Sequence, residues 1–141
     1  MIERYLTQTH FTSEEDFRDN LHFVVPETFN FAYDVMDEWA KVAPNKLALL
    51  WTSERGEELR ATYAEFKKQT DQAAAYFLSL GIRRGDKVML ILKRHYQWWI
   101  SMMALCKIGA VAIPATHMLT ASDICLLYTS DAADEEDSVD V

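Results

Sequence analysis

The sequence predicts an α/β fold, because residues 87–114 (KVMLILKRHYQWWISMMALCKIGAVAIP) contain a strand, a helix and a second strand in succession. The first observation is an apolar run at 88–92 without alternation, which suits a strand that is buried on both faces. The second is an apolar segment of helical length at 96–108, which ends at Gly109, a residue suited to a left-handed cap. The third is a short apolar run at 111–113. Tight connections between these segments predict a βαβ unit and a parallel sheet.

Residues 1–29 are predicted to form an amphipathic N-terminal arm. Ser13 can cap a short helix, and the acidic residues that follow it favour the positive end of the helix dipole. Phe17 and Leu21 would share one face of this helix. We expect the arm to pack across the main body; the alternative is a contact with another subunit or with a further domain.

A helix is predicted over residues 31–42, with Asn30 as its N-cap. Its apolar residues recur at helical spacing, and its charged residues, Asp37 among them, fall mostly on the other side. Trp39 belongs to the apolar face. A large aromatic residue at such a position more often anchors a core than lines a ligand pocket, so Trp39 is expected to be a core residue.

Two strands joined by a short loop are predicted next, at 46–52 and 58–61. The polar linker at 53–57 contains one glycine, which can take the positive φ angle that a tight turn requires. Its charged residues are typical of a solvated loop tip. These segments therefore predict a β-hairpin.

Thr62 and Glu65 form a capping box, which starts a helix that runs to about Leu80. The following segment, residues 81–86 (GIRRGD), has the glycines and arginines of a phosphate-binding loop. However, its spacing fits neither the dinucleotide fingerprint nor the P-loop, and its glycines precede a strand instead of opening a helix. A helix C-cap followed by a turn explains both glycines.

One histidine occupies a position that favours ligand binding. His95 follows the strand at 88–92, and open α/β sheets bind ligands at the carboxyl ends of their strands. The adjacent Trp98 and Trp99 point about 100° apart on a helix, so one can enter the core while the other packs at an edge. Core packing is the expectation for both. The remaining histidines have no sequence partner that suggests a site: His10, His22 and His117.

The charge and the cysteines narrow the class of protein. The formal net charge is −8, but six acidic residues lie after residue 124, and the rest of the chain has 14 basic and 16 acidic residues. This near neutrality gives no electrostatic reason to expect a nucleic-acid partner. Cys106 and Cys125 fit neither a metal pattern nor a disulfide framework. Without a signal-peptide core or an apolar segment of membrane-spanning length, the sequence predicts a cytoplasmic protein without a transmembrane segment.

The composition changes abruptly after residue 124. Thr120 and Asp123 have the spacing of a helix start, but the text then becomes CLLYTSDAADEEDSVDV, at residues 125–141. This acidic, low-complexity segment is predicted to be disordered. It resembles the translated read-through of a sequencing adapter; the alternative is a natural acidic tail on a truncated paralogue.

Residues 30–124 resemble the start of the AMP-forming acyl-CoA synthetases, in the acyl-adenylate-forming superfamily. The resemblance is carried by FNFAYDVMDEWAKVAPNKLALLW, by TYAEFKKQTDQAAAYFLSLGIRRGDKVMLIL and by KRHYQWWISMMALCKIGAVAIPATHMLTASDI. It covers about two thirds of the chain and is nearest to the medium-chain and acetyl-CoA synthetase-like branch. It implies that residues 30–124 are a truncated N-terminal part of an AMP-binding domain, with the hairpin and the βαβ unit flanked by helices.

The resemblance also implies a reaction. The parent enzyme would activate a carboxylic (fatty) acid with ATP to acyl-AMP and transfer the acyl group to coenzyme A, with Mg²⁺ to neutralise phosphate charge. The family's phosphate loop, its nucleotide-binding motifs and its catalytic lysine all fall beyond the matching segment. No catalytic, cofactor-binding or metal-binding residue is therefore assigned in this sequence. The fragment alone is expected to be inactive, to bind no cofactor and to self-associate; the alternative is a non-catalytic α/β interaction module or a truncated paralogue.

Overall fold

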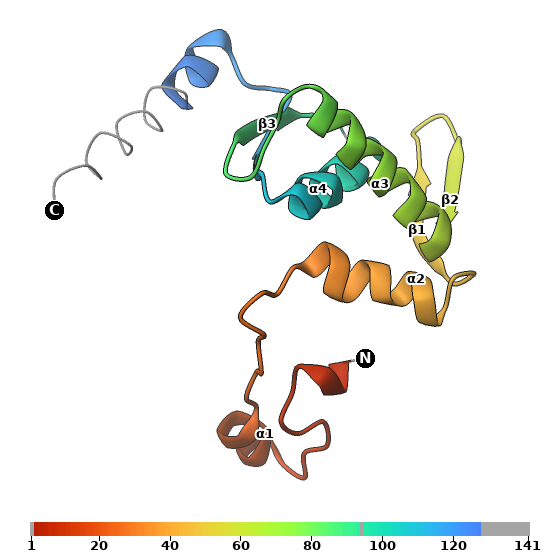
Figure 1. Cartoon of the computed structure of the whole chain (residues 1–141), viewed down its shortest axis with the longest axis vertical. Coiled ribbons are helices and arrows are strands. Elements are labelled where there is room, and N and C mark those ends of the chain that lie inside the picture. The colour runs from red at the N-terminus through yellow and green to blue at the C-terminus, as the bar shows by residue number, and fades with distance from the viewer. Residues whose placement is uncertain (1, 94, 128–141) are drawn as a thin grey trace, which may run out of the picture.

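A computed structural model describes residues 2–93 and 95–127 of the chain (Figure 1). The fold is mixed α/β, as the sequence predicts. Its elements, in chain order, are η1 (Ile2–Arg4), α1 (Glu14–Asn20), η2 (Ala32–Asp37), α2 (Glu38–Val42), β1 (Leu47–Thr52), β2 (Glu58–Thr62), α3 (Tyr63–Ser79), β3 (Lys87–Ile91), α4 (Gln97–Ile108) and β4 (Val111–Ala115). A further helical stretch spans residues 121–127, and its first turn is closed by Thr120 and Asp123, as expected. The sequence predicts disorder over residues 125–141, but residues 125–127 belong to this helical stretch. The rest of that segment, residues 128–141, lies outside the described residues.

The predicted βαβ unit is confirmed. Strands β3 and β4 pair in parallel, with Met89 opposite Ile113, and α4 connects them. Gly109 ends α4 at a φ of 72°, the left-handed conformation that glycine adopts without steric cost. The expectation of a strand buried on both faces is wrong: Leu90 is buried, whereas Ile91 is 41% exposed. The reason is that β3 and β4 form a sheet of only two strands within the described part of the chain.

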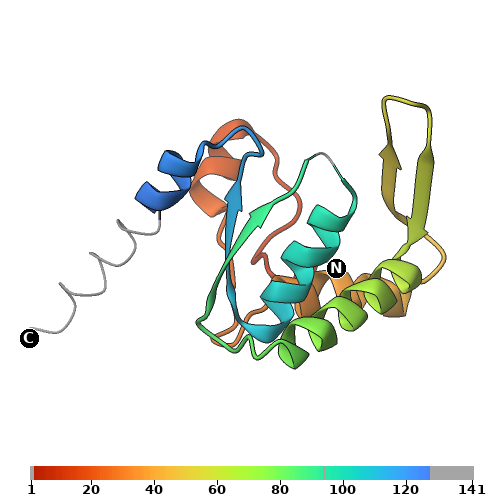
Figure 2. The same cartoon turned by 90° about the horizontal axis from the view of Figure 1, so that it is seen from above.

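The predicted hairpin is also present, as a separate two-stranded sheet. Strands β1 and β2 pair antiparallel, with Trp51 opposite Leu59 and an irregularity between Leu47 and Leu49. Gly56 takes a φ of 80° in the connecting loop. Figure 2 shows the hairpin beside the start of α3, apart from β3 and β4.

Helices α3 and α4 pack against each other and form the centre of the fold (Figures 1 and 2). The capping box is confirmed: Thr62 Oγ1 accepts from the backbone N of Glu65 at 3.3 Å, and Glu65 Oε2 accepts from the backbone N of Thr62 at 2.8 Å. Helix α4 also contacts η2 and β4. The buried apolar residues are Ala32, Ala61, Phe66, Ala74, Leu90, Ala104 and Leu105.

The helix predicted over residues 31–42 forms, but its first half is a π-helix, η2, and only its second half, α2, is an α-helix. Asn30 caps it as expected, because Asn30 Oδ1 accepts from the backbone N of Ala32 at 3.0 Å. A π-helix has wider turns than an α-helix, so the face that it buries differs from the face that α-helical spacing predicts. As a result Phe31 and Val42 are 46% and 66% exposed, and Asp37, which was expected on the polar side, is buried.

Asp37 belongs to a charged cluster that joins three helices. Lys107 Nζ, from α4, lies 2.8 and 3.0 Å from the two carboxylate oxygens of Asp37 and 2.6 Å from Asp71 Oδ1, from α3. Lys67 Nζ lies 3.5 Å from Asp37 Oδ2 and also pairs with Asp71. Burial raises the pKa of Asp71, but hydrogen bonds from Lys107 and Lys67 outweigh that effect and hold the pKa below its ordinary value. The cluster therefore satisfies charges that burial would otherwise make costly.

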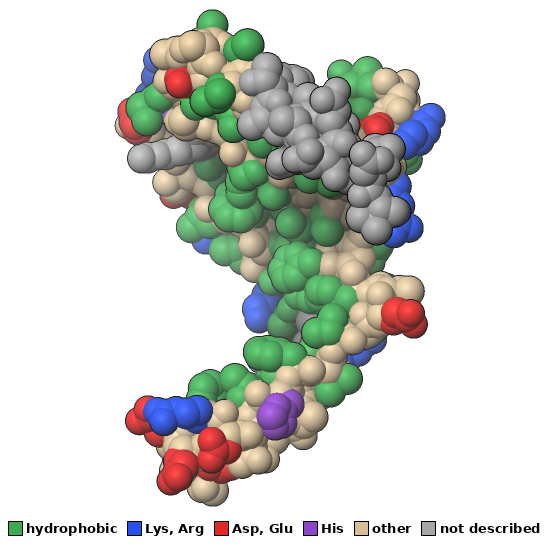
Figure 3. Space-filling view, turned by 90° about the vertical axis from the view of Figure 1, so that its left-hand side faces the viewer, with side chains coloured by type: hydrophobic (Ala, Val, Ile, Leu, Met, Phe, Trp, Pro, Cys, Tyr) green, Lys and Arg blue, Asp and Glu red, His purple; other side chains and the backbone are tan. Residues whose placement is uncertain are grey.

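The N-terminal arm folds on itself, and the expectation that it packs across the main body is wrong. Ser13 caps α1 as expected, with Ser13 Oγ accepting from the backbone N of Asp16. Residues near Leu6 then pair with residues near Phe23 through an antiparallel bridge. Figure 3 shows the arm as a lobe that joins the body through a narrow neck. The join includes the hydrogen bond from Tyr5 Oη to the carbonyl oxygen of Asp34 in η2, at 3.0 Å.

Candidate functional site

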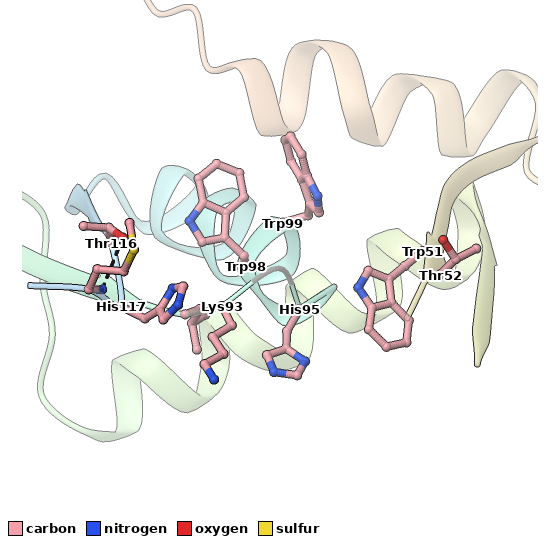
Figure 4. A pocket seen from close by; sticks show the side chains of 10 residues that line it. Trp51, Thr52, Lys93, His95, Trp98, Trp99, Thr116 and His117 are labelled. Carbon is pink, nitrogen blue, oxygen red and sulfur yellow. Dashed lines mark hydrogen bonds between the residues drawn. The ribbon is translucent and has the colours of Figure 1, made fainter. Parts of the chain in front are cut away.

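A cavity of about 530 Å³ lies at the carboxyl ends of β3 and β4, beside the end of β1 (Figure 4). This volume is within the usual range of small-molecule sites. The lining residues are Trp51, Thr52, Leu92, Lys93, His95, Trp98, Trp99, Thr116, His117 and Met118. The carboxyl ends of parallel strands are where open α/β sheets bind ligands, so this cavity is the candidate site.

Two connections bring most of the polar lining residues together. Lys93 and His95 lie in the short link between β3 and α4, and His117 lies just after β4. The turn that carries His117 is held by a hydrogen bond from the backbone N of Met118 to Thr116 Oγ1, at 3.3 Å. Because β3 and β4 are parallel and adjacent, the residues that follow them meet at one edge of the sheet.

Aromatic rings form much of the cavity wall. Trp51 stacks on His95, with ring centroids 6.2 Å apart and planes inclined by 28°. The ring of Tyr96 meets Trp51 edge-on at 5.5 Å. Trp98 and Trp99, in the first turn of α4, meet edge-to-face at 4.6 Å. Such contacts are favourable for aromatic pairs and fix the orientation of the rings.

The structure confirms the expected position of His95 and corrects two other interpretations. Trp98 and Trp99 both line the cavity, and Trp99 is 51% exposed, so the expectation of core packing is wrong for this pair. The reason is that α4 buries its second half, around Leu105, while its first turn lies at the open end of the sheet. His117 was not connected to any site, yet it lines the same cavity as His95. The rule that pointed to His95 after the first strand applies equally after the second, so the sequence contained the signal for His117.

Other residues considered as ligand groups lie elsewhere. Gly81 and Gly85 flank a turn at the amino end of β3, opposite to the cavity, where Asp86 Oδ2 accepts from the backbone N of Arg83 at 2.7 Å. Trp39 does not line the cavity. It stacks on Tyr63 at 5.6 Å, with Lys46 Nζ 4.3 Å from the centroid of its ring. His10 and His22 belong to the arm.

The charge of the lining is one-sided. It contains one lysine and two histidines but no aspartate or glutamate. Carboxylate oxygens are the ligands that Mg²⁺ takes from proteins, so the cavity does not fit this ion. Nowhere in residues 2–93 and 95–127 do three metal-ligating side chains gather. The same residues include no helix that is both long and apolar enough to cross a bilayer.

Comparison with known proteins connects this fold to one family. A family model described as "AMP-binding enzyme" matches residues 36–132. Human acyl-coenzyme A synthetase ACSM3, mitochondrial, is 34% identical over 136 residues, which cover 92% of this chain and 23% of that protein. Rat acyl-coenzyme A synthetase ACSM5, mitochondrial, is 37% identical over 106 residues, or 71% of this chain and 18% of that protein. The chain thus spans about a quarter of the length of the curated relatives that it matches.

These relatives overturn the expectation of a cytoplasmic protein, because they are mitochondrial enzymes. The sequence offered only the lack of a disulfide framework, of a signal-peptide core and of a membrane-spanning segment. These features do not choose among the compartments that keep thiols reduced.

Solved structures agree with the sequence relatives. The N-terminal domain of FACL13 from Mycobacterium tuberculosis superposes with a TM-score of 0.63 at 26% identity, over 70% of this chain and 24% of that one. Acetoacetyl-CoA synthetase from Streptomyces lividans gives a TM-score of 0.60 at 28% identity, over 68% of this chain and 15% of that one. With the family model matching most of its length, the chain belongs to the AMP-binding enzymes, among the relatives of the AMP-forming acyl-CoA synthetases.

Proposed function

We propose that this chain is the N-terminal part of the adenylating domain of an acyl-CoA synthetase. The complete enzyme would activate a carboxylic acid of the fatty-acid class with ATP, giving acyl-AMP and pyrophosphate. It would then transfer the acyl group to coenzyme A. The observation that supports this proposal is the 34% identity to human ACSM3 along 92% of the chain, which includes the hairpin, α3 and the βαβ unit.

Within such an enzyme, we propose that these residues act as scaffold and do not catalyse the reaction alone. Adenylation requires the phosphates to be held, the acid to be positioned for in-line attack and the developing charge to be neutralised. At the cavity, Lys93 supplies a positive charge, and His95 and His117 supply imidazole rings. They do not supply the carboxylates that Mg²⁺ needs, so no step that uses the metal is assigned to this chain.

The test is pyrophosphate release that depends on added acid, with ATP, Mg²⁺ and acids from acetate to medium-chain length. Two proteins are compared: the 141-residue chain, and human ACSM3 in which residues 30–124 of this chain replace the matched segment. We expect no release above a blank from the chain alone. We expect release with at least one acid from the chimera, and thioester formation when coenzyme A is added.

Unmodified ACSM3 is the positive control, and circular dichroism shows whether the chimera is folded. Pyrophosphate release by the chain alone would refute the scaffold role. A folded chimera that is inactive on every acid would contradict the proposal that this segment serves acid activation. Stable binding of the chain to intact ACSM3, without any activity, would instead favour the alternative of an interaction module.

We also propose that the isolated chain self-associates. Within the described residues its parallel sheet consists of β3 and β4 alone, so each strand has an outer edge. Ile91 in β3 and Val111 in β4 are 41% and 48% exposed. Unpaired strand edges with apolar neighbours favour pairing with another copy. Size-exclusion chromatography should show an elution volume that falls as the concentration rises, whereas a monomer at every concentration would contradict this expectation.

A further inference from the structure

We propose that two copies of this chain form a closed dimer by exchanging their N-terminal arms, so that the arm of each copy docks on η2 and α2 of the other. The arm consists of a folded lobe, residues 2–23, and a neck, residues 24–29, which leads to η2. This inference does not depend on the ligase activity proposed above. It also differs from association through strand edges, because it uses another surface and stops at two copies.

The lobe is only lightly attached to its own body. Tyr5 Oη donates to the carbonyl oxygen of Asp34 at 3.0 Å, and Arg4 Nη1 lies 3.4 Å from Glu38 Oε2. Helix α1 buries none of its residues, and within the described residues neither α1 nor η1 packs extensively against another helix or strand. Such an attachment costs little to break, and the same contacts can form again on the body of a second copy.

The neck has the properties of a hinge. Its residues form no helix or strand, and the backbone N of Phe29 donates to the carbonyl oxygen of Pro26 at 3.1 Å, which closes a turn. Opening this turn would extend the neck and carry the lobe away from its own body. Pro26 favours an extended backbone at the residue before it, which lowers the cost of the open form. Exchange of an identical element through such a hinge is a low-cost route to a dimer.

Exposed apolar side chains at the hinge favour exchange over the closed monomer. Phe23, Val24 and Val25 are consecutive, and they are 68%, 51% and 66% exposed. Figure 3 shows hydrophobic side chains gathered between the lobe and the body. In a dimer with two-fold symmetry the two open necks run past each other, so each set of these side chains covers the other. The contacts of the lobe are the same in both forms, so this additional burial decides the balance.

The distribution of charge identifies what the lobe docks on. Residues 1–29 contain six acidic and two basic residues, whereas residues 30–124 contain twelve basic and ten acidic residues. Two arms therefore repel each other, but the arm of one copy is attracted to the body of another. This complementarity favours a second copy of the chain, with arm on body, as the partner of the exposed surface.

The experiment reverses the charges of the ion pair between Arg4 and Glu38 in separate copies. Arg4→Glu and Glu38→Arg each place like charges where the lobe meets the body, so each variant alone should dimerise with a Kd about tenfold higher than that of the unaltered chain. In an equal mixture, both lobes of a mixed dimer meet a body of opposite charge, so the original Kd should return. Analytical ultracentrifugation measures each Kd, and circular dichroism checks that the variants are folded.

Arg18→Glu is the matched control for charge reversal on the arm. Its partner, Glu14, lies 2.9 Å away within α1, so this change should alter the dimer Kd less than about twofold. A second variant tests the hinge. Deleting Glu27 and Thr28, the central residues of the turn, should prevent the lobe from reaching its own body and give a dimer at every concentration.

Three results would overturn the exchange. A chain that is monomeric at every concentration would assign the exposed surface to the remainder of a complete enzyme. A dimer whose Kd is the same for Arg4→Glu as for the unaltered chain would place the contact elsewhere, for example at the strand edges. Failure of the mixture to regain the original Kd would show that the ion pair forms within one chain.

Discussion

Replacing Lys107 by methionine is expected to lower the free energy of unfolding by about 3–5 kcal/mol, because it removes the nearer cation of the buried Asp37 carboxylate and leaves only Lys67, at 3.5 Å. The Lys107 and Asp37 side chains are only 2% and 8% exposed, and they join α4 to η2. Methionine has a similar length, so the change removes charge more than volume. Whole domains are stable by only about 5–15 kcal/mol, so this one substitution would use up a large part of the total. Urea unfolding followed by circular dichroism measures the effect.

Two further variants separate the buried charge from general effects of losing a lysine. Lys41→Met removes the partner of Glu38 from an ion pair in which the lysine side chain is 66% exposed, and it should cost less than about 1 kcal/mol. The double variant Asp37→Leu with Lys107→Met removes both buried charges and should recover most of the stability that the single variant loses. If Lys107→Met lowered the free energy of unfolding no more than Lys41→Met, the charged cluster would not stabilise the packing of the helices as the distances indicate.

Leu105→Ala is expected to cost about 2–5 kcal/mol, since it opens a cavity at the centre of the fold. Leu105 is 0% exposed and lies on α4, which contacts α3, β4 and η2. The side chains around it belong to several elements, so they cannot all move in to fill the space. The urea concentration at the unfolding midpoint should fall, while the slope of the unfolding free energy against urea concentration stays the same.

The matched control is Leu78→Ala on α3, where the leucine is 43% exposed. The same chemical change there should cost less than about 1 kcal/mol, because little apolar surface is lost from the interior. If Leu105→Ala and Leu78→Ala lowered the free energy of unfolding by similar amounts, α4 would not be the centre of the core.

Local signals in the sequence were sufficient to predict most of the elements. The capping box at Thr62, the left-handed glycine at Gly109 and the hairpin glycine at Gly56 each act within a few residues, and each is confirmed. The order of strand, helix and strand also predicted the parallel pairing, because chain geometry leaves few alternatives. The position of His95 at the edge of the sheet followed from that topology alone.

The features that the sequence did not predict depend on contacts between segments that are distant in the chain. Asp37 looked like a surface residue because its partner, Lys107, lies 70 residues away and on a helix that reads as apolar. The tryptophans of α4 looked like core residues because nothing local shows that the helix begins at an open edge of the sheet. The wide turns of η2 leave no pattern that α-helical spacing can reveal. In each case the deciding interaction is absent from the neighbourhood of the residue in the sequence.

The long sequence separation of the charged cluster has a consequence for the order in which the chain assembles. The hairpin, α3 and the βαβ unit are each closed by short connections, whereas two links from residues 30–37 to α4 span 76 and 70 residues: Asn30 Nδ2 to the carbonyl oxygen of Cys106, and Lys107 to Asp37. Closing a long loop costs more entropy than closing a short one, so units with short-range contacts are expected to form earlier in folding. The segment that comes early in the chain is therefore late in folding, and weakening its attachment should hasten unfolding while leaving the folding rate almost unchanged.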